Sequence, residues 1–193
     1  MKMMIGGGWL RQGLCLVAIT LSLTACVTGP VSLDMRYPEG VVSESSAPTT
    51  PACSVKIDSI TDARGNKHTL GHIGTAPVYG KDIEDWVRRG LADLRALGYQ
   101  VVDTGAVSPP LVRMDVSLKQ AYVRSVNTSL ESVMRLTVRY TRSNGSVVER
   151  SYRGSYVRTN WVAAADEIMG TLNHAMIGAV RDIAKDLPAL CGA

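Results

Sequence analysis

Three stretches between residues 111 and 160 alternate apolar and polar residues, and this pattern constrains the fold more than any other feature of the chain. Such alternation is typical of β-strands with one buried and one solvated face. A turn at 127–129 and the Asn144-Gly145 pair, a strong hairpin signal, separate the three stretches. We therefore expect an antiparallel meander. The residues expected to face its core are apolar and regularly spaced: Val112, Met114, Val116, Leu118 and Tyr122, then Leu130, Met134, Leu136, Val138 and Tyr140, then Val148, Tyr152 and Tyr156.

The rest of the folded region reads as shorter strands and two amphipathic helices. The expected elements are a strand at 53–60, a Gly-rich loop at 61–80, a helix at 81–97, a short strand at 99–102 and a helix at 161–187. Gly98 is expected to end the first helix and Pro188 the second. The order β-α-β-β-β-β-α predicts an α+β fold, a two-layer sandwich in which two helices cover one face of a mainly antiparallel sheet.

The N-terminus has the composition of an export signal. Lys2 and Arg11 precede an apolar run at 13–25 that ends in small residues. This run is shorter than the about 20 apolar residues that a membrane-spanning helix needs. A short apolar run behind positive charge predicts a secretory signal peptide, which should be left out of the fold.

The end of this signal, Leu23-Thr24-Ala25-Cys26, resembles the lipobox of bacterial lipoproteins. The resemblance implies a lipoprotein-type signal peptide at 1–25, cleavage before Cys26, and three acyl chains on Cys26. Two or more chains anchor a protein stably to a membrane without spanning it. The next residue is Val27 rather than the Asp of an inner-membrane retention signal, so the expected location is the periplasmic face of the outer membrane.

The mature chain divides into a tether and one domain. Residues 26–52 are rich in Pro, Ser and Thr and are expected to be a flexible tether behind the lipidated cysteine. Within it, the apolar piece at 31–38 could pack on the domain as an edge segment. Residues 53–193 are expected to form a single α+β periplasmic domain.

The expected location bears on whether the remaining cysteines form a disulfide. Cys15 leaves with the signal and Cys26 carries lipid, so Cys53 and Cys191 are left. In an oxidising periplasm two such cysteines most often pair. A Cys53–Cys191 disulfide is therefore favoured, and the alternative is two unpaired buried thiols.

Several short motifs occur in an order that resembles the YajG family of bacterial lipoproteins. They are Asp62-x-Arg64 after the first strand, Ile73-Gly74 in the Gly-rich loop, and Leu97-Gly98-Tyr99 after the helix. A lipobox and tether precede them, and a long meander and closing helix follow. The resemblance covers most of the mature chain and implies an envelope lipoprotein with this fold. It implies no catalytic residues.

Motifs for catalysis and cofactor binding are missing from the sequence. There is no Gly-x-Ser-x-Gly, Ser-x-x-Lys or phosphate-loop pattern. His68 and His72 lie in a glycine-rich segment with no third ligand at a suitable spacing, so solvated loop histidines are expected rather than a metal site. Asp62 and Arg64 are expected to form an ion pair that holds the loop. We expect a non-enzymatic protein without a cofactor or a metal.

Charge is the one feature of the meander that points to a partner. Residues 111–160 hold nine Arg or Lys against three acidic residues, although the mature chain as a whole carries only about +2. Export and this small charge argue against nucleic acid. The cations expected on the outer sheet face are Arg113, Lys119, Arg135, Arg139 and Arg153.

This face predicts binding to an envelope partner, either a protein or an anionic glycolipid or polymer. The plainer interpretation is an ordinary solvated face. An alternative function is that of an accessory lipoprotein in lipid or lipopolysaccharide transport, which would need a lipid-sized apolar cavity between sheet and helices.

Overall fold

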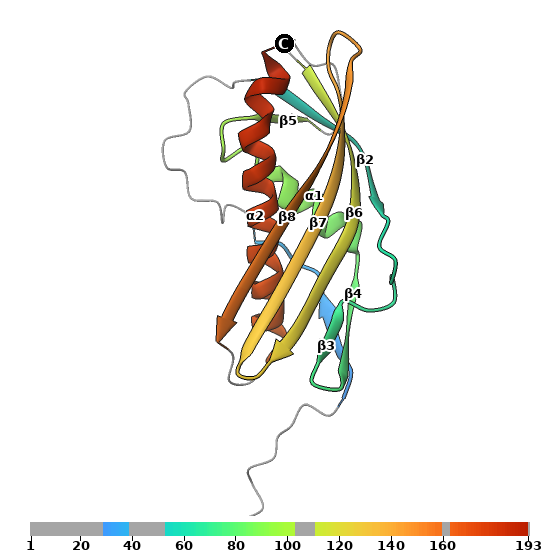
Figure 1. Cartoon of the computed structure of the whole chain (residues 1–193), viewed down its shortest axis with the longest axis vertical. Coiled ribbons are helices and arrows are strands. Elements are labelled where there is room, and N and C mark those ends of the chain that lie inside the picture. Colours follow the sequence, from blue (N-terminus) through green and yellow to red (C-terminus); the bar gives the residue numbers. More distant parts are fainter. Residues whose placement is uncertain (1–28, 39–52, 103–110, 160–162, 193) are drawn as a thin grey trace, which may run out of the picture.

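The computed structural model describes residues 29–38, 53–102, 111–159 and 163–192. They form an open eight-stranded sheet and two helices, an α+β arrangement that confirms the expected fold class (Figure 1). The elements are β1 Val31–Asp34, β2 Ser54–Asp62, β3 Gly71–Ile73, β4 Ala76–Lys81, α1 Ile83–Ala92, β5 Gln100–Val102, β6 Leu111–Val126, β7 Ser129–Thr141, β8 Val147–Thr159 and α2 Ala165–Cys191.

The antiparallel meander is confirmed as β6, β7 and β8. Strand β7 pairs along its whole length with β6 on one side and with β8 on the other. Its expected core side chains are all fully buried: Leu130, Met134, Leu136, Val138 and Tyr140. Asn127 and Gly145 take the positive φ angles, 53° and 80°, that the two tight turns require.

The remaining strands add parallel pairings to this meander. On the side away from β7, β6 pairs in parallel with β2 and, further along the strand, with β3. Strand β2 also pairs in parallel with β5, and β1 with β4. Strands β3 and β4, which form an antiparallel hairpin, lie where the sequence predicted only a Gly-rich loop. These strands are short and contain Gly71, Pro77 and Gly80, so no alternation marks them, and their pairing with β6 and β1 defines them.

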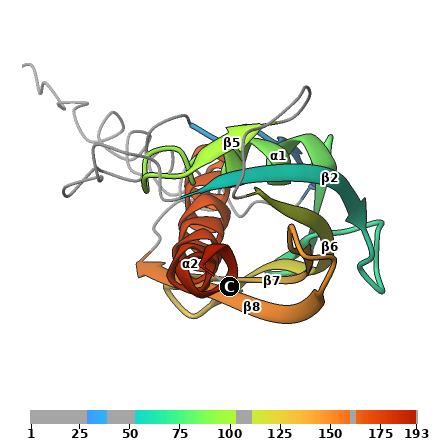
Figure 2. The same cartoon turned by 90° about the horizontal axis from the view of Figure 1, so that it is seen from above.

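Both helices pack on the same face of the sheet. Figure 2 shows the sheet curving around α2, with α1 beside it. The indole nitrogen of Trp86 in α1 donates a 2.8 Å hydrogen bond to the side-chain oxygen of Asn173 in α2. The amide nitrogen of Asn173 donates in turn to the Arg36 carbonyl, which ties the segment after β1 to the helices. All three groups are thereby satisfied inside the fold.

The helix ends differ from the expectation in a way that hydrogen bonding explains. Helix α1 ends at Ala92, and tighter turns continue the coil to Gly98, which has a φ of 89°. Helix α2 does not stop at Pro188 but runs on to Cys191. Pro188 lacks the N–H that would bond the Ala184 carbonyl. The Tyr99 hydroxyl donates to that carbonyl at 2.9 Å instead.

One strand face was also assigned wrongly. The register between β6 and β7 shifts between Leu118 and Gln120, so Lys119 is the extra residue of a β-bulge. Beyond the bulge the side-chain parity reverses. Ala121 and Val123 face the core, and Tyr122, which was expected there, lies only half buried.

Candidate functional site

The structure places all five predicted cations at exposed positions of the meander: Arg113, Lys119, Arg135, Arg139 and Arg153. The strand register arranges the outer face in rows that cross β6, β7 and β8. Two of the cations lie in rows that contain carboxylates. Arg113 donates to the Asp58 carboxylate. Arg139 on β7 lies between two acidic residues, Asp115 on β6 and Glu149 on β8. These two cations are therefore balanced by acidic neighbours.

The other three cations form a row of their own, which we call the cationic row: Lys119, Arg135 and Arg153. Arg135 lies directly opposite Arg153 on β8 and opposite Gln120 on β6, beside the bulged Lys119. No carboxylate of the described residues forms an ion pair with any of the three. Like charges directly opposite each other destabilise a sheet, so this row has a local cost that an anion would relieve.

Hydroxyl groups border the cationic row on one side. Ser117, Thr137 and Ser151 lie in register across the three strands, and the Thr137 and Ser151 hydroxyls are 3.1 Å apart. Guanidinium groups bind phosphate and carboxylate through two parallel N–H donors, and hydroxyls add further donors. The arrangement is thus able to bind an extended anion. The sequence predicted these three cations on the outer face together with Arg113 and Arg139, but it could not separate the two groups, because that separation depends on the register between the strands.

The loop after β2 is built around the expected ion pair. The Arg64 guanidinium makes two hydrogen bonds to the Asp62 carboxylate, of 2.9 and 2.8 Å, and its side chain is only 4% exposed. Burial alone would raise the pKa of Asp62, but the hydrogen bonds from Arg64 outweigh it and keep this pKa below its ordinary value. The ion pair is therefore structural.

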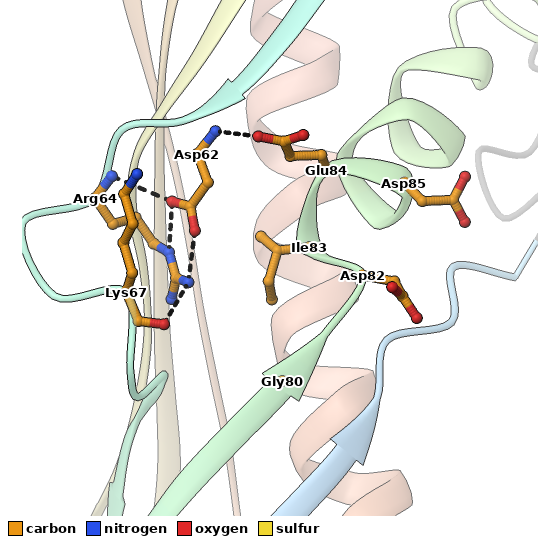
Figure 3. A pocket seen from close by; sticks show the side chains of 8 residues that line it. All are labelled: Asp62, Arg64, Lys67, Gly80, Asp82, Ile83, Glu84 and Asp85. Atoms are coloured by element: carbon orange, nitrogen blue, oxygen red, sulfur yellow. Dashed lines mark hydrogen bonds and ion pairs between the residues drawn. The ribbon is translucent and has the colours of Figure 1, made fainter.

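A hollow of about 670 Å³ opens beside this ion pair, against the start of α1 (Figure 3). One carboxylate oxygen of Glu84 accepts the backbone N–H of Asp62 across it, at 2.8 Å. Asp82 and Asp85 lie on the same wall as Glu84, and Asp85 pairs with Arg89. Asp62, Arg64 and Glu84 are thus engaged with one another, which suits a structural joint between β2 and α1 better than a catalytic centre.

The two histidines considered as metal ligands are both exposed, and the two cysteines of the domain are paired. His68 lies exposed on the loop and His72 exposed on β3, and the described residues contain no group of three potential ligands that could hold a metal ion. Cys53 and Cys191 form a disulfide with their Cα atoms 6.0 Å apart. Cys26 lies outside the described residues. Within the described ranges, no helix is both long and apolar enough to cross a bilayer.

Comparison with solved structures finds one bacterial protein that shares this fold and others with a more distant likeness. A Xanthomonas campestris protein of the DUF330 family is 10% identical, with a TM-score of 0.50 over 83% of this chain and 94% of that chain. A hypothetical protein of Chlamydia trachomatis is 7% identical, with a TM-score of 0.47 over 72% of this chain and 98% of that one. A minor lipoprotein of Acinetobacter baumannii is 11% identical, with a TM-score of 0.40 over 72% and 93%. None of the three is named as an enzyme.

No protein-family model matches the sequence, and no curated protein matches it either. At these identities, the likeness to solved structures establishes the fold alone.

Proposed function

We propose that this chain is a non-enzymatic lipoprotein, anchored through Cys26 to the periplasmic face of the outer membrane, that binds an anionic envelope partner. The cationic row carries this proposal. Lys119, Arg135 and Arg153 are exposed side by side on rigid strands without an acidic partner. A ligand that supplies regularly spaced phosphates or carboxylates would compensate all three charges at once.

The anchor would hold the domain close to the membrane. Val31, where β1 begins, is only five positions after Cys26, and five residues span at most about 18 Å. The segment 31–38 is firmly part of the domain, because Leu33, Met35 and Tyr37 are buried and the Tyr37 hydroxyl donates to the Asp93 carboxylate at 2.7 Å. In this proposal the end of the molecule that contains β1, β3 and β4 (Figure 1) faces the lipid.

Charge reversal of the cationic row is the first test. We expect Arg135→Glu/Arg153→Glu to lower the affinity for the partner at least about tenfold, since each lost charge-assisted contact contributes about 1.5–3 kcal/mol. A photo-crosslinking residue at Thr137, in the hydroxyl row next to Arg135 and Arg153, should capture the partner in cells when the rest of the protein is unaltered and not in the double variant.

The matched control reverses two exposed cations on the helices, Arg89 and Lys185, and so changes the net charge equally. It should leave the crosslinked product unchanged. Equal crosslinking from the row variant and the control variant would contradict the proposed binding face.

The lipid anchor is tested at the cysteine itself. We expect Cys26→Ser to abolish incorporation of labelled palmitate and to move the protein from the outer-membrane fraction to the soluble periplasm, because no acceptor for the diacylglycerol remains. Cys15→Ser, which alters the signal peptide alone, should retain both label and location. Continued labelling of the Cys26→Ser variant would exclude this residue as the anchor.

The transport alternative has no supporting observation. Both of the hollows described here, beside Asp62 and beside Lys119, are lined largely by polar side chains and lie at the surface. The inner face of the meander is filled by side chains that α2 covers.

A further inference from the structure

A second hollow lies beside the bulge at Lys119 and adjoins the cationic row. Its volume is about 260 Å³, below the range of roughly 300–1,000 Å³ that drug-sized ligands occupy, so it suits a single ring-sized unit. The polar and aromatic side chains that line it come from the loop after β2, from β3 and from β6: Asn66, Thr69, His72, Lys119, Gln120 and Tyr122.

The loop wall of this hollow is held rigidly. The buried Arg64 side chain donates to the carbonyls of Lys67 and Thr69, both at 3.3 Å. The Asn66 side-chain oxygen accepts the backbone N–H groups of His68 and Thr69, and its amide nitrogen donates to the Thr69 hydroxyl at 2.9 Å. The wall is therefore organised before any ligand arrives, which lowers the entropic cost of binding.

An aromatic ring lies against the opposite side. A Cβ on Gly71 would come within 2.9 Å of the Tyr122 ring and 1.9 Å of the Val123 carbonyl oxygen, so only glycine lets the ring lie this close to β3. Gly71 also has a φ of 119°, which side-chain-bearing residues rarely adopt. Tyr122 is half buried, and it lines the hollow.

Four polar groups at the hollow form no hydrogen bond with other described residues of the protein. Among the described residues, none donates to or accepts from the Lys119 ammonium, the Gln120 amide, the His72 ring or the Tyr122 hydroxyl. A cation, an amide, an imidazole and an aromatic ring thus converge on one small space. Such a set complements a sugar ring that bears an anionic group: the C–H face packs on the aromatic ring, the hydroxyls pair with amide and imidazole, and the anion pairs with the ammonium.

We infer that this hollow binds one phosphate- or carboxylate-bearing sugar unit of an anionic glycan, whose further charges lie along Arg135 and Arg153. The inference deepens the proposed function and rests on it. An extended peptide fits less well, because peptides add along free sheet edges. The side of β6 that faces this hollow is open only from Lys119 to Tyr122, between its pairing with β2, which ends at Leu118, and its pairing with β3, which begins at Val123.

Titrations of the folded domain with single sugars, followed by nuclear magnetic resonance, test the hollow directly. Glucose 6-phosphate or N-acetylmuramic acid should shift the signals of Tyr122, His72 and Lys119, and neutral glucose should bind at least about tenfold more weakly, the loss of one charge-assisted contact. Tyr122→Ala should weaken binding up to about tenfold, because the sugar loses the aromatic ring on which it packs. Tyr79→Ala, which removes a 40% exposed tyrosine on β4 away from the hollow, should not.

Two further probes identify the source of the sugar, and either positive result supports the inference. Preferential binding to vesicles that contain a phosphorylated glucosamine glycolipid would indicate a membrane glycolipid, and preferential binding to soluble muramic-acid fragments a cell-wall polymer. No shift at the three residues with either sugar, or equal weakening by the Tyr79 variant, overturns the inference.

The proposal about the hollow and the proposal about the cationic row can be contradicted independently of each other. If Arg135→Glu/Arg153→Glu loses the cellular partner while Tyr122→Ala keeps it and no sugar binds, the proposed function stands and the sugar site is wrong. If the sugars bind the hollow while charge reversal of the row leaves the cellular partner in place, the sugar site stands and the cationic row is not the partner's contact.

Discussion

Replacing both Cys53 and Cys191 with alanine is expected to lower the free energy of unfolding by about 4–5 kcal/mol. The disulfide joins residues 138 positions apart and so closes a loop that includes nearly the whole domain. The chain-entropy account assigns the largest gains to such long loops. The bond also ties the last turn of α2 to the residue before β2, two segments at opposite ends of the domain sequence.

Urea unfolding followed by circular dichroism measures this effect. The unaltered protein in a reducing buffer serves as the control and should unfold at the same midpoint as the double variant. A double variant that matches the oxidised protein would show that the tie contributes nothing to stability.

Gly154→Ala is expected to destabilise the protein strongly, at a cost of about 3 kcal/mol. The new Cβ would lie 1.7 Å from the Ala175 carbonyl oxygen and 2.9 Å from the Ala179 nitrogen, both backbone atoms of α2. A flexible side chain could move aside, but a helix backbone cannot do so without separating α2 from β8. Gly154 therefore lies where the backbones of β8 and α2 approach each other closely.

Gly170→Ala is the matched control for this prediction. It adds the same methyl group to α2, where the nearest atom is 3.9 Å away, on Arg158. Removing a glycine from a helix interior stabilises it by about 0.5–1 kcal/mol. Thermal unfolding should therefore move the two variants in opposite directions, and a shared direction would contradict the close-approach argument.

The two stability predictions concern the inner face of the sheet, and the binding predictions concern its outer face. This separation has a physical origin in the strand repeat, because alternate side chains of β7 point to opposite faces. Arg135 and Arg139 alternate with Met134, Leu136 and Val138, which are fully buried. Charge reversal on the outer face should therefore leave the packing against α2 intact.

Much of the fold could be predicted from local patterns. The long strands, the hairpin turn at Asn144-Gly145 and the stripe of α2 each depend on residues that are neighbours in sequence, so their periodicity is visible without the structure. The Asp62–Arg64 pair was predictable for the same reason, since its members are two residues apart.

The sequence by itself thus determined the strand and helix periods, the cations of the meander and the two cysteines available for pairing. Only the tertiary structure decided the partners of the short strands β1, β3 and β4, the continuation of α2 past Pro188, and the reversal of side-chain parity at Lys119. It also separated the cations that carboxylates balance from the three that form the cationic row. Each of these depends on which residues meet across distant strands, and a bulge of one residue changes the face of every side chain beyond it.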